Sequence, residues 1–218
     1  MARKKAQKKI KKVKKKPKEE KQARGFIFFM IALLLIVLVI SFWASISRKF
    51  DYAGVEFNKV KQGDLNLYYA KFPLRDVSGQ ITAYLPFYFR EDPRELNRIE
   101  INGTIKLKTG VALAVNSDNI VCEDSVLSGA TLSLFLNSVG VSPFGATTNK
   151  TEAEEFNRIY VSCENPGNVT VLLYKGGDTS KIEQKGDCYV LNIANCEIMN
   201  VTERFMIGLY AHSRGIEI

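Results

Sequence analysis

The sequence has only one histidine, His212, in 218 residues, and this scarcity restricts the chemistry that the chain can perform. A histidine metal centre needs several imidazole ligands, and a Ser-His-Asp triad or a Cys-His pair would have to use His212. The sequence also lacks a G-x-S-x-G elbow, a Walker phosphate loop, a G-x-G-x-x-G segment and an S-x-x-K pair. We therefore expect a protein that is not an enzyme, with no catalytic residues and no cofactor.

Cysteine is also scarce, and no two cysteines form a C-x-x-C pair. The four are Cys122, Cys163, Cys188 and Cys196. Their spacing argues against a thioredoxin-like redox site and against a zinc ribbon. An even number of cysteines is typical of structural disulfides in an oxidising compartment. Of the three possible pairings, we favour Cys122–Cys163 with Cys188–Cys196, although the sequence leaves the other two open.

Acidic residues are nearly missing from the N-terminus, where residues 1–24 carry thirteen Lys and Arg but only Glu19 and Glu20. This tail has a net charge of +11, and the remaining chain has a net charge of −3. The tail contains no aromatic side chain to stack on bases, which argues against specific nucleic-acid binding. We expect residues 1–25 to lie in the cytoplasm and to contact anionic lipid headgroups, at about 1 kcal/mol per basic residue near the surface.

Charge is absent from residues 26–46, which read FIFFMIALLLIVLVISFWASI. A helix of 21 residues is about 31 Å long, which matches the hydrocarbon core of a bilayer. These residues therefore predict a single transmembrane helix that acts as a signal-anchor. The lysine-rich side of such a span stays in the cytoplasm, which places the C-terminal part outside. A cleaved signal peptide is the alternative, because Ser45-Ile46-Ser47 has the small-x-small pattern of a cleavage site.

Beyond this segment the sequence contains four N-x-S/T sequons, which are acceptors for N-glycosylation. They begin at Asn102, Asn149, Asn168 and Asn200, and the tail has none. Together with the position of the cysteines, they predict a glycoprotein domain on the external side of a cell membrane.

The remaining sequence predicts a membrane-proximal stalk at residues 47–64 and one extracytoplasmic domain at residues 65–218, of α+β or α/β class. We expect a mixed sheet with one or two packed helices. Strand patterns occur at residues 65–72, 81–89, 99–107, 111–115, 158–162, 169–174 and 188–193. The first two predict a hairpin whose second strand lies at a sheet edge because of Pro86, and VALAV at 111–115 predicts a central strand. Helices are expected from Pro93, over residues 125–141 and over residues 202–212, with a strand as the alternative for the last of these.

Residues 125–148 contain no charged side chain. Glycine, proline, asparagine and serine within them argue against a second span. A helix buried against the sheet and a partner interface are the two remaining interpretations.

An oxygen-rich cluster follows the predicted central strand, at the edge of a sheet where α/β proteins often bind ligands. Its members are Asn116, Asp118, Asn119, Glu123 and Asp124. Carboxylate and amide oxygens are calcium ligands, but the EF-hand spacing is absent, and the same residue types are common in turns. We retain calcium binding as a hypothesis beside the ordinary turn.

The residues Arg24-Gly25-Phe26-Ile27-Phe28-Phe29, after a basic leader, resemble the start of archaeal type IV pilin-like membrane proteins. The resemblance implies that the leader is removed between Gly25 and Phe26 and that the apolar helix then assembles into a filament core. The acid often found near the start of such helices is absent here, since that position is Met30. The resemblance carries no expectation for the outer domain.

Taken together, the sequence predicts a single-pass membrane-anchored cell-envelope protein that presents a non-enzymatic interaction or structural domain outside the membrane. Its expected partners are the lipid bilayer and either another envelope protein or a second copy of itself. The alternatives are a pilin-like assembly protein processed after Gly25 and an extracytoplasmic enzyme of unrecognised type.

Overall fold

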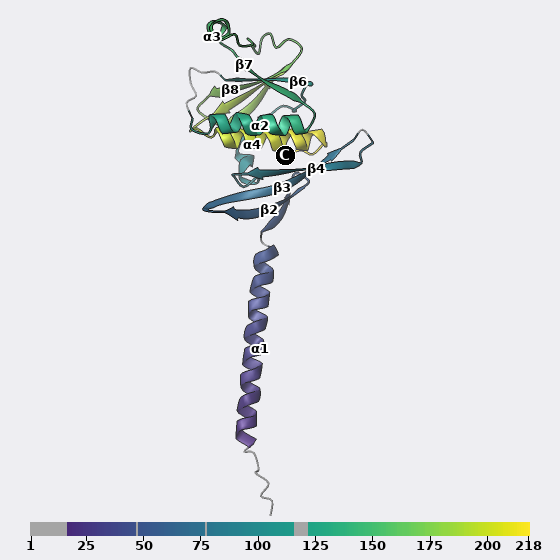
Figure 1. Cartoon of the computed structure of the whole chain (residues 1–218), viewed down its shortest axis with the longest axis vertical. Helices are drawn as coiled ribbons and strands as arrows, with labels where there is room; N and C mark the ends of the chain where they lie inside the picture. The colour runs from purple at the N-terminus through teal and green to yellow at the C-terminus, as the bar shows by residue number, and fades with distance from the viewer. Residues whose placement is uncertain (1–16, 47, 77, 116–121) are drawn as a thin grey trace, which may run out of the picture. The chain divides into compact units, whose positions relative to one another are not determined.

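The computed structural model describes residues 17–46, 48–76, 78–115 and 122–218, and within the first helix it describes the side chains of residues 24–39 and 41. The chain divides into two compact units, Met1–Ser47 and Arg48–Ile218. The first unit contains the helix α1 (Pro17–Ile46), and all other elements belong to the second unit (Figure 1).

The helix α1 includes all of residues 26–46, for which the sequence predicts a membrane span. Its apolar side chains are exposed, from 46% for Met30 to 71% for Phe28. Within the described part of the chain, no helix combines the length and the hydropathy needed to cross a bilayer.

The second unit begins with an antiparallel sheet of four strands in the order β1 (Lys49–Tyr52), β2 (Val55–Gln62), β3 (Leu65–Arg75) and β4 (Ile81–Phe89). We expected a stalk at residues 47–64, and this was wrong because residues 49–62 form β1 and β2. The alternation that produces a half-buried strand is visible in β2, where Val55 and Phe57 are buried and Glu56 is exposed.

The predicted hairpin of residues 65–72 and 81–89 is confirmed as β3 and β4. Pro86 lies opposite Lys71 on β4, which is the edge strand, as expected for a residue without a backbone N–H. At the turn, the carboxylate of Asp76 accepts hydrogen bonds from the backbone N–H groups of Ser78 and Gln80. The hydroxyl of Ser78, followed by these N–H groups, holds the pKa of Asp76 below its usual value.

A second sheet has six strands instead of the single sheet that we expected for the whole domain. Its strands are β5 (Glu100–Asn102), β6 (Gly110–Val115), β7 (Ser142–Thr147), β8 (Thr170–Gly176), β9 (Lys181–Lys185) and β10 (Cys188–Ile193). They lie in the order β5-β9-β10-β8-β6-β7, and the last four are parallel. The strand β6 is buried on both faces, with Val111 in one apolar cluster and Ala112 in another, which confirms the prediction of a central strand.

The helices α2 (Ser125–Ser138) and α4 (Ile198–Ser213) lie between the two sheets (Figure 1). The ring of Phe72 in β3 lies 5.7 Å from that of Phe135 in α2 and 4.8 Å from that of Tyr210 in α4. On the other side of α4, Phe205 lies 5.9 Å from Tyr189 of β10. The order of layers is therefore antiparallel sheet, two helices, mixed sheet.

Two short helices complete the unit. A 3-10 helix, η1 (Glu95–Arg98), follows Pro93, and α3 (Lys150–Glu155) begins at Asn149. The side chain of Asn149 caps α3 by accepting hydrogen bonds from the N–H groups of Thr151 and Glu152.

The strand expected over residues 99–107 ends at Asn102, because the following backbone groups bond to side chains instead of to a strand. The N–H groups of residues 104, 105, 106 and 108 donate to side chains of Gln184, His212, Tyr189 and Thr170, respectively. Gly103 makes the bend, with φ +117°, and a Cβ atom there would lie 2.4 Å from Oε1 of Gln184. Only glycine fits this position without displacement of its neighbour.

The strand expected over residues 158–162 is also wrong, since these residues make only one isolated bridge, between Thr147 and Tyr160. The segment covers the face of the mixed sheet that α2 and α4 leave free, and Val161 is buried there. Its role is to close the second apolar cluster.

The favoured disulfide pairing is wrong as well. The bonds join Cys122 to Cys196 and Cys163 to Cys188. Cys188 starts β10 and Cys196 follows its end, so an extended strand of about 20 Å separates them. A disulfide needs Cα atoms about 4.4–6.8 Å apart, which two cysteines at opposite ends of a strand cannot satisfy.

Candidate functional site

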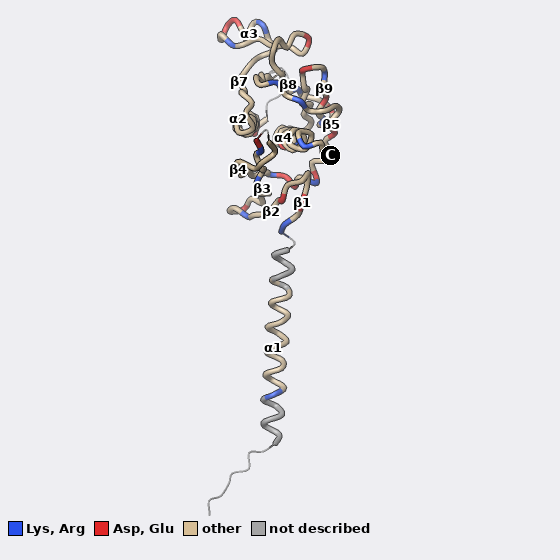
Figure 2. Tube along the Cα trace, turned by 90° about the vertical axis from the view of Figure 1, so that its right-hand side faces the viewer, with Lys and Arg blue, Asp and Glu red and all other residues tan. Residues whose placement is uncertain are grey.

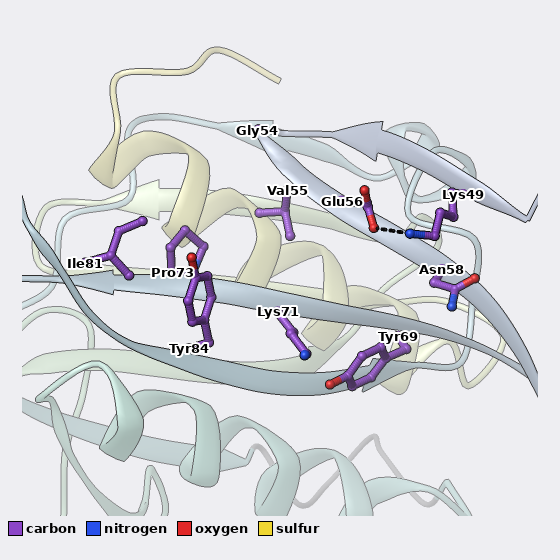
Figure 3. Close-up of a pocket in the computed structure, with 10 residues that line it drawn as sticks. All are labelled: Lys49, Gly54, Val55, Glu56, Asn58, Tyr69, Lys71, Pro73, Ile81 and Tyr84. Atoms are coloured by element: carbon purple, nitrogen blue, oxygen red, sulfur yellow. Dashed lines mark hydrogen bonds and ion pairs between the residues drawn. The ribbon is translucent and has the colours of Figure 1, made fainter. Parts of the chain in front are cut away.

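The outward face of the antiparallel sheet contains a pocket of ≈ 450 Å³, to which all four strands contribute (Figure 3). In β3 the side chains of Tyr68, Ala70 and Phe72 point into the core, so Tyr69 and Lys71 point to the pocket on the opposite face. The pocket is lined by Lys49, Gly54, Val55, Glu56, Asn58, Tyr69, Lys71, Pro73, Ile81 and Tyr84.

Strand register aligns four side chains across this face. Lys49 pairs with Asn58, Asn58 with Tyr69, and Tyr69 with Tyr88, which extends the row beyond the pocket. The rings of Tyr69 and Tyr88 have their centroids 4.9 Å apart. Tyr88 is 54% exposed and Tyr84 is 57% exposed. The face thus presents aromatic surface beside an amide and an ammonium group.

The charges in the pocket are not balanced. Lys49 Nζ lies 3.0 Å from Glu56 Oε1, so these two side chains form an ion pair. Lys71 lies between Tyr69 and Tyr84 in Figure 3, and no described residue supplies its ammonium group with a hydrogen bond or an ion pair. One positive charge therefore remains available to a ligand.

The outward face of α2 is the second unusual surface. The helix contains no charged residue (Figure 2). Its inward side chains, such as Leu132 and Phe135, are buried, but Val126 is 85% exposed and Leu134 is 65% exposed. Ala130 lies between them in sequence and is also exposed. A helix that is apolar on its solvent side as well as its core side is typical of a covered helix.

Glu203 is the most unusual buried acid among the described residues. It is 1% exposed in α4, and its Oε1 accepts the N–H of Arg90 at 2.6 Å while Oε2 accepts the N–H of Glu91 at 3.2 Å. Burial raises the pKa of Glu203 to about 7, although these two N–H groups oppose the rise. A perturbed acid often marks an active site. Here the carboxyl group is enclosed by its own structural partners, and the residues that line the pocket do not include it.

Its neighbour Arg204 is also buried and satisfied. Its Nε donates to the carbonyl of Ile99 at 3.0 Å and its Nη1 donates to the hydroxyl of Tyr52 at 3.1 Å. Tyr52 in turn donates to Asn97. Glu203 and Arg204 therefore connect α4 to the antiparallel sheet and to η1 by specific polar contacts.

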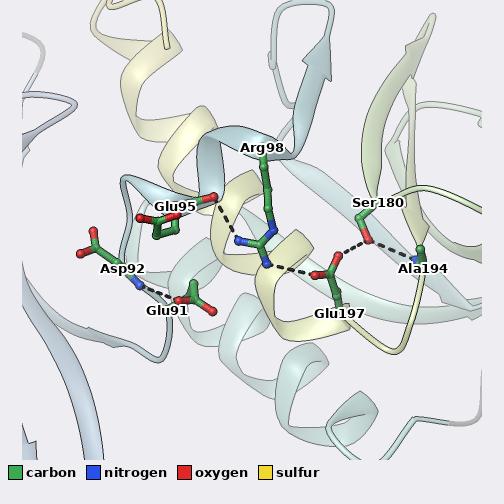
Figure 4. Close-up of polar contacts among 7 residues, drawn as sticks. All are labelled: Glu91, Asp92, Glu95, Arg98, Ser180, Ala194 and Glu197. Atoms are coloured by element: carbon green, nitrogen blue, oxygen red, sulfur yellow. Dashed lines mark hydrogen bonds and ion pairs between the residues drawn. The ribbon is translucent and has the colours of Figure 1, made fainter.

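Polar side chains also meet at the carboxyl ends of the parallel strands, where α/β sheets often bind ligands (Figure 4). Glu197, at the start of α4, accepts from Ser180 Oγ at 2.7 Å and from Arg98 Nη2 at 3.0 Å. The Ser180 hydroxyl, followed by Arg98, holds the pKa of Glu197 below its usual value. Ser180 Oγ accepts the N–H of Ala194. The network fixes the loops at this end, and among the described residues no buried side-chain nitrogen or oxygen lacks a hydrogen-bond partner.

The oxygen-rich cluster predicted as a calcium site is described only in part. Asn116, Asp118 and Asn119 lie outside the described residues. Glu123 is exposed, and both carboxylate oxygens of Asp124 accept from Nη1 of Arg90, at 3.0 and 3.1 Å. Among the described residues, no three His, Cys, Asp or Glu side chains are grouped as metal ligands.

The positions predicted for glycosylation and for processing lie on different parts of the chain. Asn102, Asn149 and Asn168 are exposed, and Asn200 is half-buried in the first turn of α4. Gly25 and Phe26 lie within α1, which continues through them as helix.

The only histidine, His212, holds a neighbouring segment of backbone by a hydrogen bond. Nδ1 of His212 accepts the N–H of Ile105 at 3.0 Å, and burial lowers its pKa. Neutral imidazole is the form that can accept this bond.

Sequence reasoning did not single out Tyr69, Lys71 or Glu203. The period of two in residues 65–72 places Tyr69 and Lys71 on one face, but the strands that complete the pocket were assigned to a stalk. The sequence around Glu203 does not indicate that this acid is buried, because its burial results from the packing of α4 between the two sheets. Searches against family models, curated proteins and solved structures found no match to this chain.

Proposed function

We propose that this chain is a single-pass cell-envelope protein whose domain outside the membrane is a non-enzymatic interaction domain, and that its partner at α2 is a second copy of the same chain. The observation that carries the interaction is the absence of charge from α2 together with the exposure of Val126 and Leu134.

The membrane anchor is part of this proposal and rests on the sequence. Residues 26–46 contain no charged side chain in 21 positions, which corresponds to about 31 Å of helix. The side chains of α1 that the structure describes belong to residues 24–39 and 41. The full length of the span is therefore taken from the sequence, and the lysine-rich tail supports a cytoplasmic N-terminus.

Two disulfides support an external location for the second unit, since such bonds persist in oxidising compartments. The exposed sequons at Asn102, Asn149 and Asn168 support the same side. The cytoplasmic tail has a different partner in this proposal, the anionic headgroups of the inner leaflet.

A second copy fits the α2 face for three reasons. An uncharged face excludes charge pairing, so its partner must also present uncharged surface, and a two-fold axis would set α2 against α2. Gly129 and Ser133 are one helical turn apart, and a Cβ atom at Gly129 would meet nothing within 4 Å, so another helix can approach closely there. Anchors in one bilayer also raise the effective concentration of copies.

The test uses the full chain, co-expressed with two different affinity tags and extracted from membranes in mild detergent. Leu134→Glu should reduce co-purification of the two forms at least about tenfold, because burying a leucine contributes about 1.5–3 kcal/mol and the new carboxylate opposes burial. Leu65→Glu is the matched control, because Leu65 is 59% exposed and lies outside α2. Co-purification that survives Leu134→Glu, or is lost equally in both variants, refutes the α2 contact.

A pilin-like assembly protein is the alternative that uses the same apolar helix. The exposed apolar side chains of α1, including Phe26 and Phe28, would then pack against other helices in a filament. Processing after Gly25 distinguishes this alternative from a permanent anchor, and the N-terminal residue of the mature protein decides between them.

A further inference from the structure

The pocket on the antiparallel sheet lies outside the interface proposed for α2, and its lining combines three kinds of group. Tyr69 and Tyr84 supply aromatic surface, Asn58 supplies an amide that can both donate and accept hydrogen bonds, and Lys71 supplies an ammonium group. At ≈ 450 Å³ the pocket is in the range of small-ligand sites. We propose that this pocket binds an acidic oligosaccharide, with a sugar ring on the tyrosines and a sugar carboxylate on Lys71.

The aromatic part of the argument rests on the row across the strands. Tyr69 and Tyr88 are directly opposite, and their ring centroids lie 4.9 Å apart with the ring planes tilted by 41°, so the two rings are in contact. Tyrosine has an apolar ring and a polar hydroxyl at its edge. A pyranose matches both features, because its C–H groups lie over a ring face while its hydroxyl groups at the rim form hydrogen bonds.

The polar groups select an acidic sugar over a neutral one. Lys49 is already paired with Glu56 at 3.0 Å, whereas no described residue pairs with Lys71. A carboxylate from the ligand would complete a charge-assisted hydrogen bond with Lys71. Asn58, which pairs with Lys49 and Tyr69 in the strand register, is placed to bond sugar hydroxyl groups beside it.

The same lining disfavours single-stranded nucleic acid, the other ligand that stacks on tyrosines. Nucleic-acid sites combine aromatic platforms with a groove of several basic residues along the backbone. Among the described residues that line the pocket, Glu56 pairs with Lys49, so Lys71 is the one cation left to a ligand and the lining forms no row of basic residues.

The experiment is calorimetric titration of the full chain in detergent micelles with trigalacturonic acid, with the neutral trisaccharide cellotriose, and with a short oligothymidylate. The inference requires saturable binding of trigalacturonic acid. Three single variants, Lys71→Ala, Tyr69→Phe and Tyr88→Ala, test the contribution of each side chain to binding. Lys71→Ala removes the ammonium group and should weaken the binding of trigalacturonic acid about tenfold, which is the effect of one charged hydrogen bond. Loss of the Tyr88 ring should weaken both saccharides, whereas Tyr69→Phe keeps the aromatic surface and should retain binding.

Lys61→Ala is the matched control, because Lys61 is an exposed lysine of β2 that does not line the pocket. This variant should bind trigalacturonic acid as the unaltered chain does. The inference is overturned if no saccharide binds up to millimolar concentration, if cellotriose binds as tightly as trigalacturonic acid, or if oligothymidylate binds more tightly than either. An equal effect of Lys71→Ala and Lys61→Ala also overturns it, since binding would then reflect general charge. None of these results bears on the α2 contact.

Discussion

Glu203→Gln should remove a specific part of the pH dependence of folding. Burial raises the pKa of Glu203 from 4.5 to about 7, which corresponds to about 3 kcal/mol between the two protonation states. The folded chain holds this proton more tightly than the unfolded chain. Stability from this group is therefore fully present below about pH 4.5, falls as the pH rises through the folded pKa, and is lost above it.

The assay is denaturant unfolding of the full chain in detergent with both disulfides intact, at about pH 5 and about pH 8. Between these values Glu203 should lower the free energy of unfolding by about 2.5 kcal/mol in the unaltered chain. Glutamine stays neutral, so the fall in stability should be smaller by that amount in Glu203→Gln. Groups that titrate equally in both chains, including His212, cancel in the comparison.

Glu197→Gln is the matched control, since Glu197 is the N-cap residue of α4 and its pKa is held below the ordinary value. Its titration lies below pH 5 in both the folded and the unfolded chain, so this variant should keep the full fall between pH 5 and pH 8. An unchanged pH dependence in Glu203→Gln would show that the carboxylate is not desolvated as described.

The remaining predictions concern the disulfides, a bend and the N-terminus. Peptide mapping without reduction should recover Cys122 joined to Cys196, and replacing both with serine should lower the free energy of unfolding by about 4 kcal/mol for a separation of 74 residues. Gly103→Ala should cost about 1–3 kcal/mol in the same unfolding assay, because its φ is +117° and Gln184 occupies the space of the new methyl group. Edman sequencing of the mature protein should give the intact N-terminus, whereas a chain beginning at Phe26 would support the pilin-like alternative.

Local sequence patterns were sufficient to predict the strands in which apolar and polar residues follow a regular pattern. The strands β3 and β4 are bounded by a turn around Asp76, and Pro86 indicates the edge. The run VALAV at β6 indicates burial on both faces, which its place between β7 and β8 confirms. In each case the signal lies within about ten residues of the element that it describes.

The prediction of a stalk at residues 47–64 was wrong because the many polar side chains there are also typical of a linker. Residues 49–62 carry Lys, Glu, Asp and Asn on one face, which resembles a linker, yet Phe50, Val55 and Phe57 occupy the alternate positions. The period of two was therefore present in the sequence. Its buried face belongs to the same apolar cluster as residues of α2 and α4, which are distant in the chain, and that packing decides the structure.

The sequence itself contained the information needed to reject the predicted bond between Cys188 and Cys196. The same residues that predict the strand at 188–193 place Cys188 and Cys196 at opposite ends of it, and so exclude the local bond. Connectivity between the correct partners depends on which segments distant in the chain come together, and spacing does not reveal this. The candidate pocket was not predictable for a similar reason, because it needs side chains from four strands in register.

The most direct test of the central claim places a photo-crosslinking residue on α2 in the full chain within native membranes. Ala130→p-benzoylphenylalanine should give, after irradiation, an adduct that contains two copies of this chain. The same residue at position 65, on the exposed end of β3, should give none. An adduct with another protein only, no adduct, or equal yield from both positions would contradict a contact between copies through α2.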